Sequence, residues 1–353
     1  MNNEFQIGDK WIGDGHPVFI MADVGANHNG DFELAKEFVR VGASIGLDGI
    51  KFQSFVVDKY HAKRIKKDGK MVDNPKYHQN LPVEMPEWWH PKLKALADEL
   101  GIVIMSTSDD VDMVRTLTKM DFPAHKLSSQ DLIFHPLIEA MAKSQKPVVI
   151  STGLATIGII EEALEICKRE GNYNVVLLQC VTCYPSEFSE VNLKAISTLK
   201  KVFQMPIGLS DHTLGEDVET VTSLGAVAMG ACMVEKHITM DRNQKGIDHH
   251  FAMEPKEWAK LVKQIRKLEE SLGNGVKQPC KREINRFKEV TKCLHAKSDL
   301  RKGEMLSPDN VKIVRPGDGI SPKYYHDVMG MVLLCDVAND EEIKWSMISP
   351  EDK

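Results

Sequence analysis

The sequence predicts an α/β protein, a (β/α)8 TIM barrel followed by a small second domain. Seven or eight short apolar runs each end in a cluster of polar residues, as barrel strands do where their carboxyl ends meet at one mouth. Helical patterns separate these runs, and the strand–helix unit recurs after roughly 25 to 30 residues. The chain has 353 residues. Because such a barrel takes about 250, roughly a hundred residues remain for another domain.

The strands, and the helices between them, are predicted from the spacing of apolar residues. The first helix begins at about Asp31, a residue type that often caps a helix amino terminus. Leu34, Phe38, Val41 and Ile45 then give this helix one apolar face. We expect strands near residues 18–22, 48–53, 102–106, 124–128, 147–151, 174–180, 205–209 and 232–237, and a closing helix over 255–272.

The barrel is predicted to end where Gly273-Asn274-Gly275 stops the last helix. We therefore assign residues 1–275 to the barrel domain and residues 276–290, which are rich in charge, to a linker. Residues 291–353 form short apolar stretches separated by glycine and proline turns. This pattern predicts a small domain with little helix.

Residues 54–86 interrupt the regular spacing. This stretch is rich in lysine and arginine and has no clear periodicity. Long connections in compact domains are commonly either lids or irregular surface segments. We favour a solvated surface loop, and a lid that closes over an anionic substrate stays open as the alternative.

Composition and charge exclude several classes of protein. The formal net charge of −6 argues against bulk nucleic-acid binding. No apolar run approaches the ~20 residues that a membrane span needs, and the first residues lack the apolar core of a signal peptide. The seven cysteines are odd in number, scattered, and mostly in predicted strands, which favours a reducing compartment. We expect a cytoplasmic protein without nucleic-acid or membrane partners.

Two histidines follow the last two predicted barrel strands. His212 ends the seventh strand and His237 ends the eighth, so the two lie on neighbouring strands. Neutral imidazoles held side by side can bind a divalent metal that keeps open positions for water and substrate. A single histidine at a strand end more often has a structural role. The pair therefore predicts a metal site.

Lysine and hydroxyl side chains end four other strands. Lys51 and Lys126 end the second and fourth strands, while Thr107, Ser129 and Ser151 end the third, fourth and fifth. A buried lysine needs an anionic partner, and cations together with hydroxyl donors suit a phosphate group. The set predicts phosphate binding. A lysine that forms a Schiff base, in a metal-free aldolase, is the alternative, and the paired histidines count against it.

Other polar residues at the predicted mouth are less specific. Asp23 and Asp131 are candidate general acid or base groups. Cys180 and Cys183 form a C-x-x-C sequence, but no second pair and no helix start directly follow it. A redox role for these cysteines is therefore disfavoured.

Motifs along nearly the whole chain, in order, resemble the sialic acid synthase family. The small domain resembles the antifreeze-like (SAF) domain of those enzymes through Leu300-Arg301-Lys302-Gly303-Glu304 and Val314-Arg315-Pro316-Gly317-Asp318-Gly319. The barrel motifs are Ala22-Asp23-Val24-Gly25-Ala26-Asn27-His28-Asn29-Gly30, Lys51-Phe52-Gln53, Ser151-Thr152-Gly153, Gly208-Leu209-Ser210-Asp211-His212-Thr213, Glu235-Lys236-His237 and Gly246-Ile247-Asp248-His249.

The resemblance implies a condensation of phosphoenolpyruvate with the open-chain aldehyde of an N-acetylmannosamine-like sugar. The products would be phosphate and a nonulosonic acid, a nine-carbon 2-keto acid, so the enzyme would be a carbon–carbon bond-forming transferase. In this family a divalent ion, often manganese, lies on the histidines matched by His212 and His237. Magnesium or cobalt is the alternative metal.

The resemblance also implies roles for individual residues. Asp23, Lys51, Gln53, Asp131 and Arg315 match catalytic positions. The positions that match phosphoenolpyruvate contacts are Lys51, Thr107, Lys126, Ser129, Ser151, Thr182 and Ser210. The positions that match sugar contacts are Gln53, Asp131, Tyr184, Asp248 and Arg315.

Arg315 matches an arginine that the small domain of one subunit inserts into the barrel of the other, which implies a domain-swapped homodimer. The sequence departs from the family at some positions. Asp23 and Asp131 replace the usual glutamates, Gln130 replaces a usual glycine, and residues 292–294 replace an arginine-containing stretch. Because these changes bear on the sugar more than on the reaction, a 2,4-diacetamido-2,4,6-trideoxy hexose, which would give legionaminic or pseudaminic acid, stays open.

Two rival functions can be weighed on the sequence. A metal-dependent barrel hydrolase would commonly carry a His-x-His on its first strand, where this chain has only His28. A carbohydrate- or ice-binding role of the small domain is disfavoured because that domain is charged, with Lys297, Arg301 and Lys302 among its residues.

Overall fold

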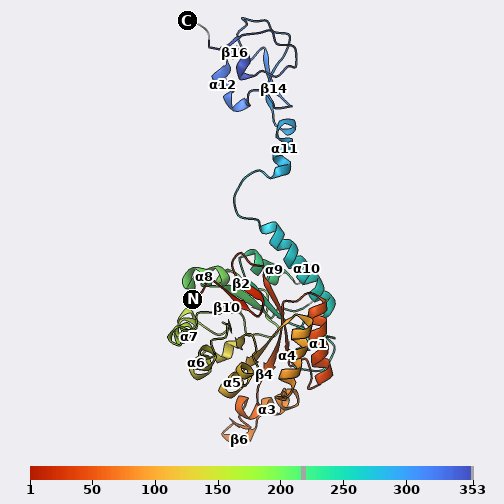
Figure 1. Ribbon diagram of the computed structural model, residues 1–353, viewed down its shortest axis with the longest axis vertical. Coiled ribbons are helices and arrows are strands. Elements are labelled where there is room, and N and C mark those ends of the chain that lie inside the picture. The colour runs from red at the N-terminus through yellow and green to blue at the C-terminus, as the bar shows by residue number, and fades with distance from the viewer. Residues whose placement is uncertain (216–219, 351–353) are drawn as a thin grey trace. The chain divides into compact units, whose positions relative to one another are not determined.

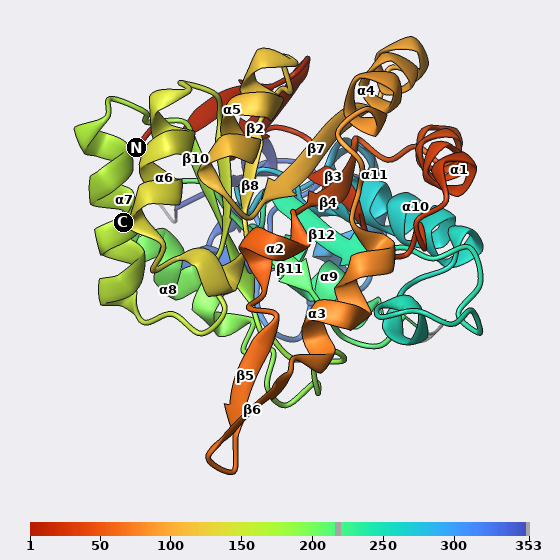
Figure 2. The same cartoon turned by 90° about the horizontal axis from the view of Figure 1, so that it is seen from below.

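A computed structural model describes residues 1–215 and 220–350. Eight parallel strands close into a barrel in the order β10-β11-β12-β3-β4-β7-β8-β9, which confirms the predicted fold class. The barrel lies at the centre of Figure 2, with helices around it. Its strands are β3 (Phe19–Gly25), β4 (Gly49–Ser54), β7 (Val103–Ser108), β8 (His125–Leu127), β9 (Val148–Ser151), β10 (Val175–Cys180), β11 (Ile207–Asp211) and β12 (Met233–His237).

Helices cover the outside of the barrel and bury their apolar faces against it (Figure 1). In the first of them, the Asp31 side chain accepts hydrogen bonds from the backbone N–H groups of Glu33 and Leu34, which confirms the predicted cap. The closing helix has the predicted bounds. The outer helices are α1 (Phe32–Ser44), α4 (Trp89–Leu100), α5 (Val111–Lys119), α6 (His135–Lys143), α7 (Ile157–Arg169), α8 (Lys194–Phe203), α9 (Val221–Ala228) and α10 (Pro255–Leu272).

A hairpin that the sequence analysis did not predict precedes the barrel. Strands β1 (Glu4–Ile7) and β2 (Lys10–Gly13) pair antiparallel. Their buried side chains Phe5, Ile7 and Ile12 pack in one cluster with Phe19 and Met21 near the start of β3. The hairpin therefore covers the amino-terminal end of the barrel, and the carboxyl end is left for chemistry.

Residues 54–86 are folded, contrary to the expectation of an irregular loop. They form α2 (Val57–Tyr60), the hairpin of β5 (Arg64–Lys67) and β6 (Lys70–Asp73), α3 (Pro75–Asn80) and the 3-10 turn η1 (Leu81–Val83). Side chains on both sides of the hairpin share a small apolar cluster, in which Phe55, Val57 and Tyr77 are buried. The exposed hairpin itself projects from the barrel in Figure 2.

The chain divides into two compact units, Met1–Gly273 and Asn274–Lys353. In the second unit, helix α11 (Lys281–Val290) occupies much of the segment assigned to the linker and buries none of its residues. The remaining elements are β13 (Cys293–Ala296), β14 (Val311–Val314), η4 (Pro322–Tyr324), α12 (Tyr325–Val328), β15 (Val332–Leu333), η5 (Trp345–Met347) and β16 (Ile348–Ser349). As predicted, the small domain has little helix. Its core contains Leu294, Leu306 and Val337.

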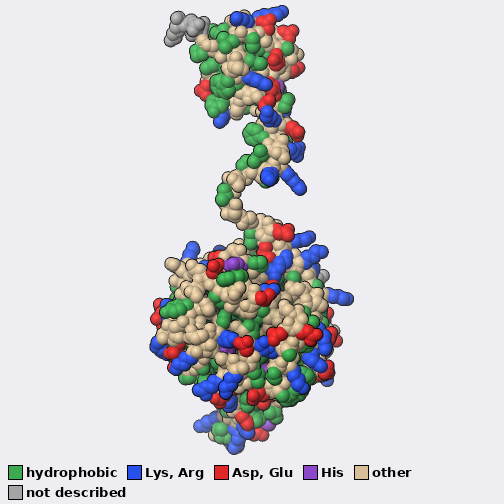
Figure 3. Space-filling model, in the orientation of Figure 1, with side chains coloured by type: hydrophobic (Ala, Val, Ile, Leu, Met, Phe, Trp, Pro, Cys, Tyr) green, Lys and Arg blue, Asp and Glu red, His purple; other side chains and the backbone are tan. Residues whose placement is uncertain are grey.

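The charges of the barrel unit are mixed in sign. On the face visible in Figure 3, acidic and basic side chains are interspersed, which agrees with a formal net charge of only −6. Within the described ranges, no helix is long and apolar enough to cross a membrane.

Candidate active site

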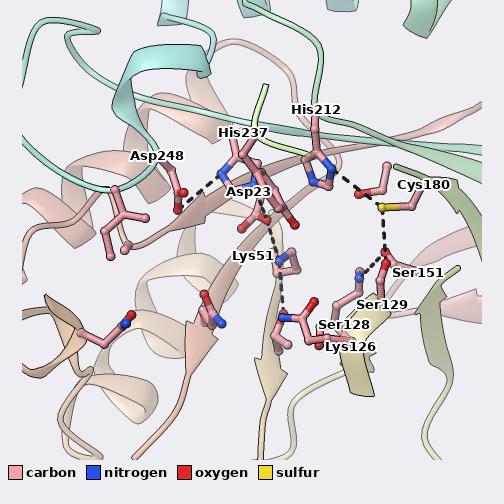
Figure 4. A pocket seen from close by; sticks show the side chains of 18 of the residues that line it. Asp23, Lys51, Lys126, Ser128, Ser129, Ser151, Cys180, His212, His237 and Asp248 are labelled. Atoms are coloured by element: carbon pink, nitrogen blue, oxygen red, sulfur yellow. Dashed lines mark hydrogen bonds and ion pairs between the residues drawn. The ribbon is translucent and has the colours of Figure 1, made fainter. Parts of the chain in front are cut away.

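A cavity of about 570 Å³ opens at the carboxyl ends of the barrel strands. Most of the side chains predicted for the site line this cavity, although they come from eight different strand ends and loops (Figure 4). These are Asp23, Lys51, Gln53, Thr107, Lys126, Ser129, Ser151, Tyr184, Ser210, His212, His237 and Asp248.

Two buried lysines lie on the floor of the cavity. Lys51 Nζ lies 2.8 Å from Asp23 Oδ2 and donates to Thr107 Oγ1 at 3.2 Å. Burial by itself would raise the pKa of Asp23, but the charges of Lys51 and His237 lower this pKa to about 2. Burial would likewise lower the pKa of Lys51, yet the carboxylates of Asp23 and Glu235 raise it. Both groups of the pair are therefore charged.

The positive charge of Lys126 is compensated less well than that of Lys51. Its Nζ donates to Ser151 Oγ at 2.7 Å and lies 3.8 Å from Glu235 Oε1. Burial is the largest influence and lowers the pKa of Lys126, and Lys51 adds repulsion that Glu235 does not fully offset. The ammonium group of Lys126 therefore lacks a sufficient counter-charge, which an anionic ligand would provide.

Hydroxyl and backbone groups surround the lysines. Ser129 Oγ accepts from the backbone N–H of Gly153 at 2.9 Å and donates to Cys180 Sγ at 3.4 Å. A Cβ atom at Gly153 would lie 2.1 Å from Thr182 Oγ1, so no larger residue fits there without displacing Thr182. Thr182 Oγ1 is buried, and it has no hydrogen-bond partner among the described residues. Hydroxyl, backbone N–H and ammonium groups are the donors that a phosphate group requires.

Glu235 is a site residue that the sequence analysis did not assign. Ser210 Oγ donates to Glu235 Oε1 at 3.0 Å, whereas the buried Oε2 atom has no partner in the described part of the chain. Alternate residues of a strand face the same way, and Glu235 and His237 both line the cavity while Lys236 turns outward to Asp211. This two-residue spacing was the signal that could have identified Glu235.

The two predicted metal ligands face the cavity together. The ring centroids of His212 and His237 lie 5.5 Å apart. His212 Nδ1 lies 2.9 Å from the carbonyl oxygen of Val181, so this nitrogen donates and Nε2 is left for a ligand. His237 Nε2 lies 3.3 Å from Asp23 Oδ2, and its buried Nδ1 lacks a hydrogen-bond partner within residues 1–215 and 220–350.

The electrostatics of the histidine pair also bear on metal binding. Burial is the main reason that the pKa of His237 is lowered, which favours a neutral ring with a free lone pair. Burial acts in the same direction on His212, but Cys180 and the Val181 carbonyl outweigh it and raise the pKa of His212. A divalent ion would compete with that proton. The orphaned nitrogen and the two facing rings fit a metal with open positions.

One wall of the cavity carries residues expected to contact a sugar, and two of them lie beside the histidines. Asp248 Oδ2 lies 3.9 Å from His237 Nδ1, and the half-exposed Tyr184 ring packs 4.4 Å from the His212 ring, centroid to centroid. The folded segment 54–86 also contributes to this wall. Its lining residues are Tyr60, His61, Lys76, Gln79 and Asn80.

Two carboxyl groups lie behind this wall. Asp131 is in the 3-10 turn η2 (Ser129–Asp131), and its carboxylate accepts a hydrogen bond from Ser128. Asp109, which the sequence analysis did not consider, accepts from Gln53 Nε2 at 3.3 Å. Burial, reinforced by the nearby Asp131, raises the pKa of Asp109 to about 7. Such a shift is typical of groups at functional sites.

Arg315 lies in the second unit, in the turn that follows β14, and its side chain is exposed. The residues that line the barrel cavity all belong to the first unit. The expected role of Arg315 in the barrel of another subunit stays a prediction.

Known proteins share both units of this chain. Residues 38–277 match the NeuB family and residues 291–349 match the SAF domain. The chain is 37% identical to N,N'-diacetyllegionaminic acid synthase of Campylobacter jejuni over 93% of this chain and 99% of that protein. It is 33% identical to human N-acetylneuraminate-9-phosphate synthase over 98% of this chain and 96% of that protein.

A solved structure gives the same result. The crystal structure of N-acetylneuraminic acid synthetase from Leptospira borgpetersenii, in complex with citrate, matches with a TM-score of 0.74 and 34% identity. The match covers 81% of this chain and 95% of that one. The motifs, the barrel with its SAF domain and these likenesses agree, and the chain belongs to the NeuB family.

Proposed function

We propose that this protein is a nonulosonic acid synthase that condenses phosphoenolpyruvate with the open-chain aldehyde of an N-acetylated hexosamine. One observation carries the proposal: a single cavity places two buried lysines beside two facing imidazoles. An enol phosphate needs fixed cations, an aldehyde needs an electrophilic partner, and the two reactants must be held together. The proposed enzyme is a carbon–carbon bond-forming transferase.

The lysine side of the cavity binds phosphoenolpyruvate in this proposal. Lys126 has the deficit of negative charge that a phosphate or carboxylate group removes. Hydrogen bonds from ionised donors to such oxygens are short and strong. The remaining contacts come from the hydroxyl-bearing side chains and from the second lysine, namely Lys51, Thr107, Ser129, Ser151, Thr182 and Ser210.

His212 and His237 hold a divalent ion, for which manganese is the expected metal and magnesium or cobalt the alternatives. When bound, this ion supplies Lewis-acid polarisation of the aldehyde oxygen and positions water. The lone pairs come from His212 Nε2 and from the unpartnered nitrogen of His237. Asp248 and Tyr184 lie against these rings and orient the sugar beside them.

The carboxylates at the mouth assist the chemical steps. C3 of phosphoenolpyruvate attacks the aldehyde carbon, water adds at C2, and the resulting tetrahedral species expels phosphate. Asp23, whose pKa is lowered to about 2, is ionised and lies between Lys51 and His237, where its carboxylate can accept a hydrogen bond from that water and orient it. Gln53 and Asp131 contact the sugar on the opposite side.

The second unit completes the site in the proposed assembly. Arg315 is exposed in a turn, as a residue that enters another subunit would be. A domain-swapped homodimer would bring this guanidinium to the sugar side of a partner barrel. All seven cysteines are free in the structure, which supports the expected cytoplasmic setting.

The sugar is either an N-acetylmannosamine-like hexosamine or a 2,4-diacetamido-2,4,6-trideoxy hexose. The side chains of Asp23 and Asp131 are shorter than those of glutamates and leave more room. Because a differently substituted sugar could use that room, both candidate sugars are to be tested. The deciding experiment supplies phosphoenolpyruvate, manganese and each candidate sugar, and reads phosphate release and product mass. Phosphate release that does not need an amino sugar, or turnover of a simple ester or amide, would instead favour a metal-dependent hydrolase.

A further inference from the structure

A second group of metal-binding side chains lies in the small unit, within residues 293–342. Cys293, His295 and Glu342 each place one ligand atom within 4.8 Å of the others. Cys293 and His295 are alternate residues of β13 and so face the same way. Glu342 is the bridge partner of His295 on the adjoining segment.

The backbone carbonyl of Pro316 joins this group from the turn after β14. Its oxygen lies 3.0 Å from Cys293 Sγ and 2.9 Å from His295 Nε2, and Sγ lies 3.1 Å from Nε2. Cys293 is 0% and His295 3% exposed, so bulk water does not satisfy these atoms. Three atoms with lone pairs therefore face one another, and two of them belong to buried side chains.

Cys293 Sγ, His295 Nε2 and the Pro316 oxygen have too few protons among them to satisfy all three atoms by hydrogen bonds. His295 Nδ1 lies 2.8 Å from the carbonyl oxygen of Asp340 and must donate to it. In a neutral ring, Nε2 is then an acceptor that faces a second acceptor, the Pro316 oxygen. The thiol of Cys293 has one proton and can satisfy only one of the two. A cation among the three atoms removes the conflict, since every lone pair then points at positive charge.

We propose that Cys293, His295, Glu342 and the Pro316 carbonyl form a structural site for a divalent metal of the zinc type. Thiolate, imidazole and carboxylate are the ligands that zinc takes in proteins, usually four at a time. The Asp340 carbonyl fixes the ring tautomer that presents Nε2. The backbone N–H of Asp318 donates to Glu342 Oε1 at 3.2 Å and orients the carboxylate.

Gly319 supports the proposed site by its lack of a side chain. A Cβ atom there would lie 2.7 Å from the Ile343 carbonyl oxygen, 3.0 Å from Cys293 Sγ and 3.2 Å from Glu342 Cβ, which is too close for ordinary contacts. Only a glycine lets the backbone come this near both to Ile343 and to the Cys293 thiol. The Cys293 ligand is a thiolate, so metal binding displaces the thiol proton.

The site has a consequence for Arg315, and this consequence alone rests on the proposed function. Pro316 directly follows Arg315, so a metal bound to the Pro316 carbonyl would hold the turn that carries the guanidinium. Loss of the metal would loosen that turn and raise KM for the sugar. Metal binding itself is measured without substrates, so it stands or fails independently of the synthase assignment.

The experiment uses the full chain with His212→Ala and His237→Ala, which removes the barrel histidines as competing ligands. Cobalt is added to this chelator-treated protein, and thiolate-to-cobalt charge-transfer absorption is recorded together with metal content. We expect one equivalent of cobalt with a thiolate band. The band is lost when Cys293→Ser or His295→Ala is added, and it persists with Cys335→Ser, which replaces an exposed free cysteine of the same unit.

A second measurement avoids any change in the small unit. Zinc X-ray absorption on the same barrel variant should show one sulfur ligand at about 2.3 Å. A zinc shell without sulfur, or no stoichiometric metal at all, would overturn the proposal. Persistence of the thiolate band in Cys293→Ser would also overturn it.

Discussion

Asp109 Oδ2 accepts a hydrogen bond from Gln53 Nε2 at 3.3 Å, while its buried Oδ1 atom has no partner in the described ranges. The carboxyl group thus lies beside Gln53, which is proposed to contact the sugar, and close to Asp131. Burial and this neighbour raise the pKa of Asp109 to about 7. The group therefore changes its charge near neutral pH, where the enzyme would work.

The first prediction concerns the pH dependence of stability. An acid whose folded pKa is raised from 3.8 to about 7 binds a proton in the folded chain that the unfolded chain has released. Stability contributed by this group is therefore lost as pH rises from about 4 to about 7, by an amount on the order of 4 kcal/mol. Asp109→Asn should flatten that part of the unfolding profile and stabilise the protein at pH 8.

Urea unfolding at pH 5 and pH 8 measures this difference. Asp9→Asn, which removes an exposed carboxylate of the first hairpin, is the matched control and should follow the unsubstituted protein. If Asp109→Asn shifts the free energy of unfolding equally at both pH values, the raised pKa of Asp109 is wrong.

The second prediction separates binding from stability at Lys126. Since burial lowers the pKa of Lys126, its charge is costly when no anion is bound. Lys126→Met should leave the free energy of unfolding unchanged or higher, while KM for phosphoenolpyruvate rises roughly 10- to 100-fold through loss of a charged hydrogen bond. Steady-state kinetics and thermal unfolding measure the two effects. Lys143→Met, on the exposed side of α6, should change neither.

Some of this site could be predicted from the sequence and some could not. Strand ends revealed Lys51, Lys126 and the histidines, because a parallel barrel turns its carboxyl ends to one mouth. Asp109 directly follows strand β7, but its raised pKa depends on burial beside Asp131, which the sequence pattern does not show. Thr182 Oγ1 lies against Gly153, where a Cβ atom would displace it, and this is a three-dimensional relationship.

The elements of the fold, too, could be predicted from the sequence only in part. Helix α10 was predicted with its observed bounds because it begins at Pro255 and the Gly273-Asn274-Gly275 stretch stops it. The hairpin β1–β2 was missed because its strands have only four residues each, too short for a reliable alternation. Helix α11 was missed because none of its residues is buried and its pattern is dominated by charge. Whether Arg315 enters a partner barrel depends on contacts between subunits, which local sequence patterns do not reveal.

The third prediction concerns the histidine pair. His212→Ala or His237→Ala should lower metal-dependent turnover about a thousandfold or more, because a Lewis acid contributes several kcal/mol to such a reaction. The fold should persist, since each ring lies at the cavity and not in the apolar core. Turnover is measured against manganese concentration and folding by circular dichroism. His135→Ala replaces a half-exposed histidine and should be neutral; undiminished rates in either site variant would remove the metal assignment.

The fourth prediction tests whether Arg315 acts across subunits. Arg315→Ala and His237→Ala should each be inactive as homodimers. When the two proteins are unfolded and refolded together, half of the dimers are mixed and each contains one intact site, so roughly a quarter of the activity should return. Arg315 is exposed, so its replacement should not alter stability. A mixture as inactive as its components would contradict a role in trans.

The account depends most on carbon–oxygen cleavage of an enol phosphate after water adds at C2. Turnover of phosphoenolpyruvate and an N-acetylated hexosamine in water labelled with oxygen-18, followed by mass analysis of the released phosphate, tests this most directly. The account predicts phosphate without solvent oxygen, released only when the amino sugar is present. Labelled phosphate, or release without the sugar, would contradict it.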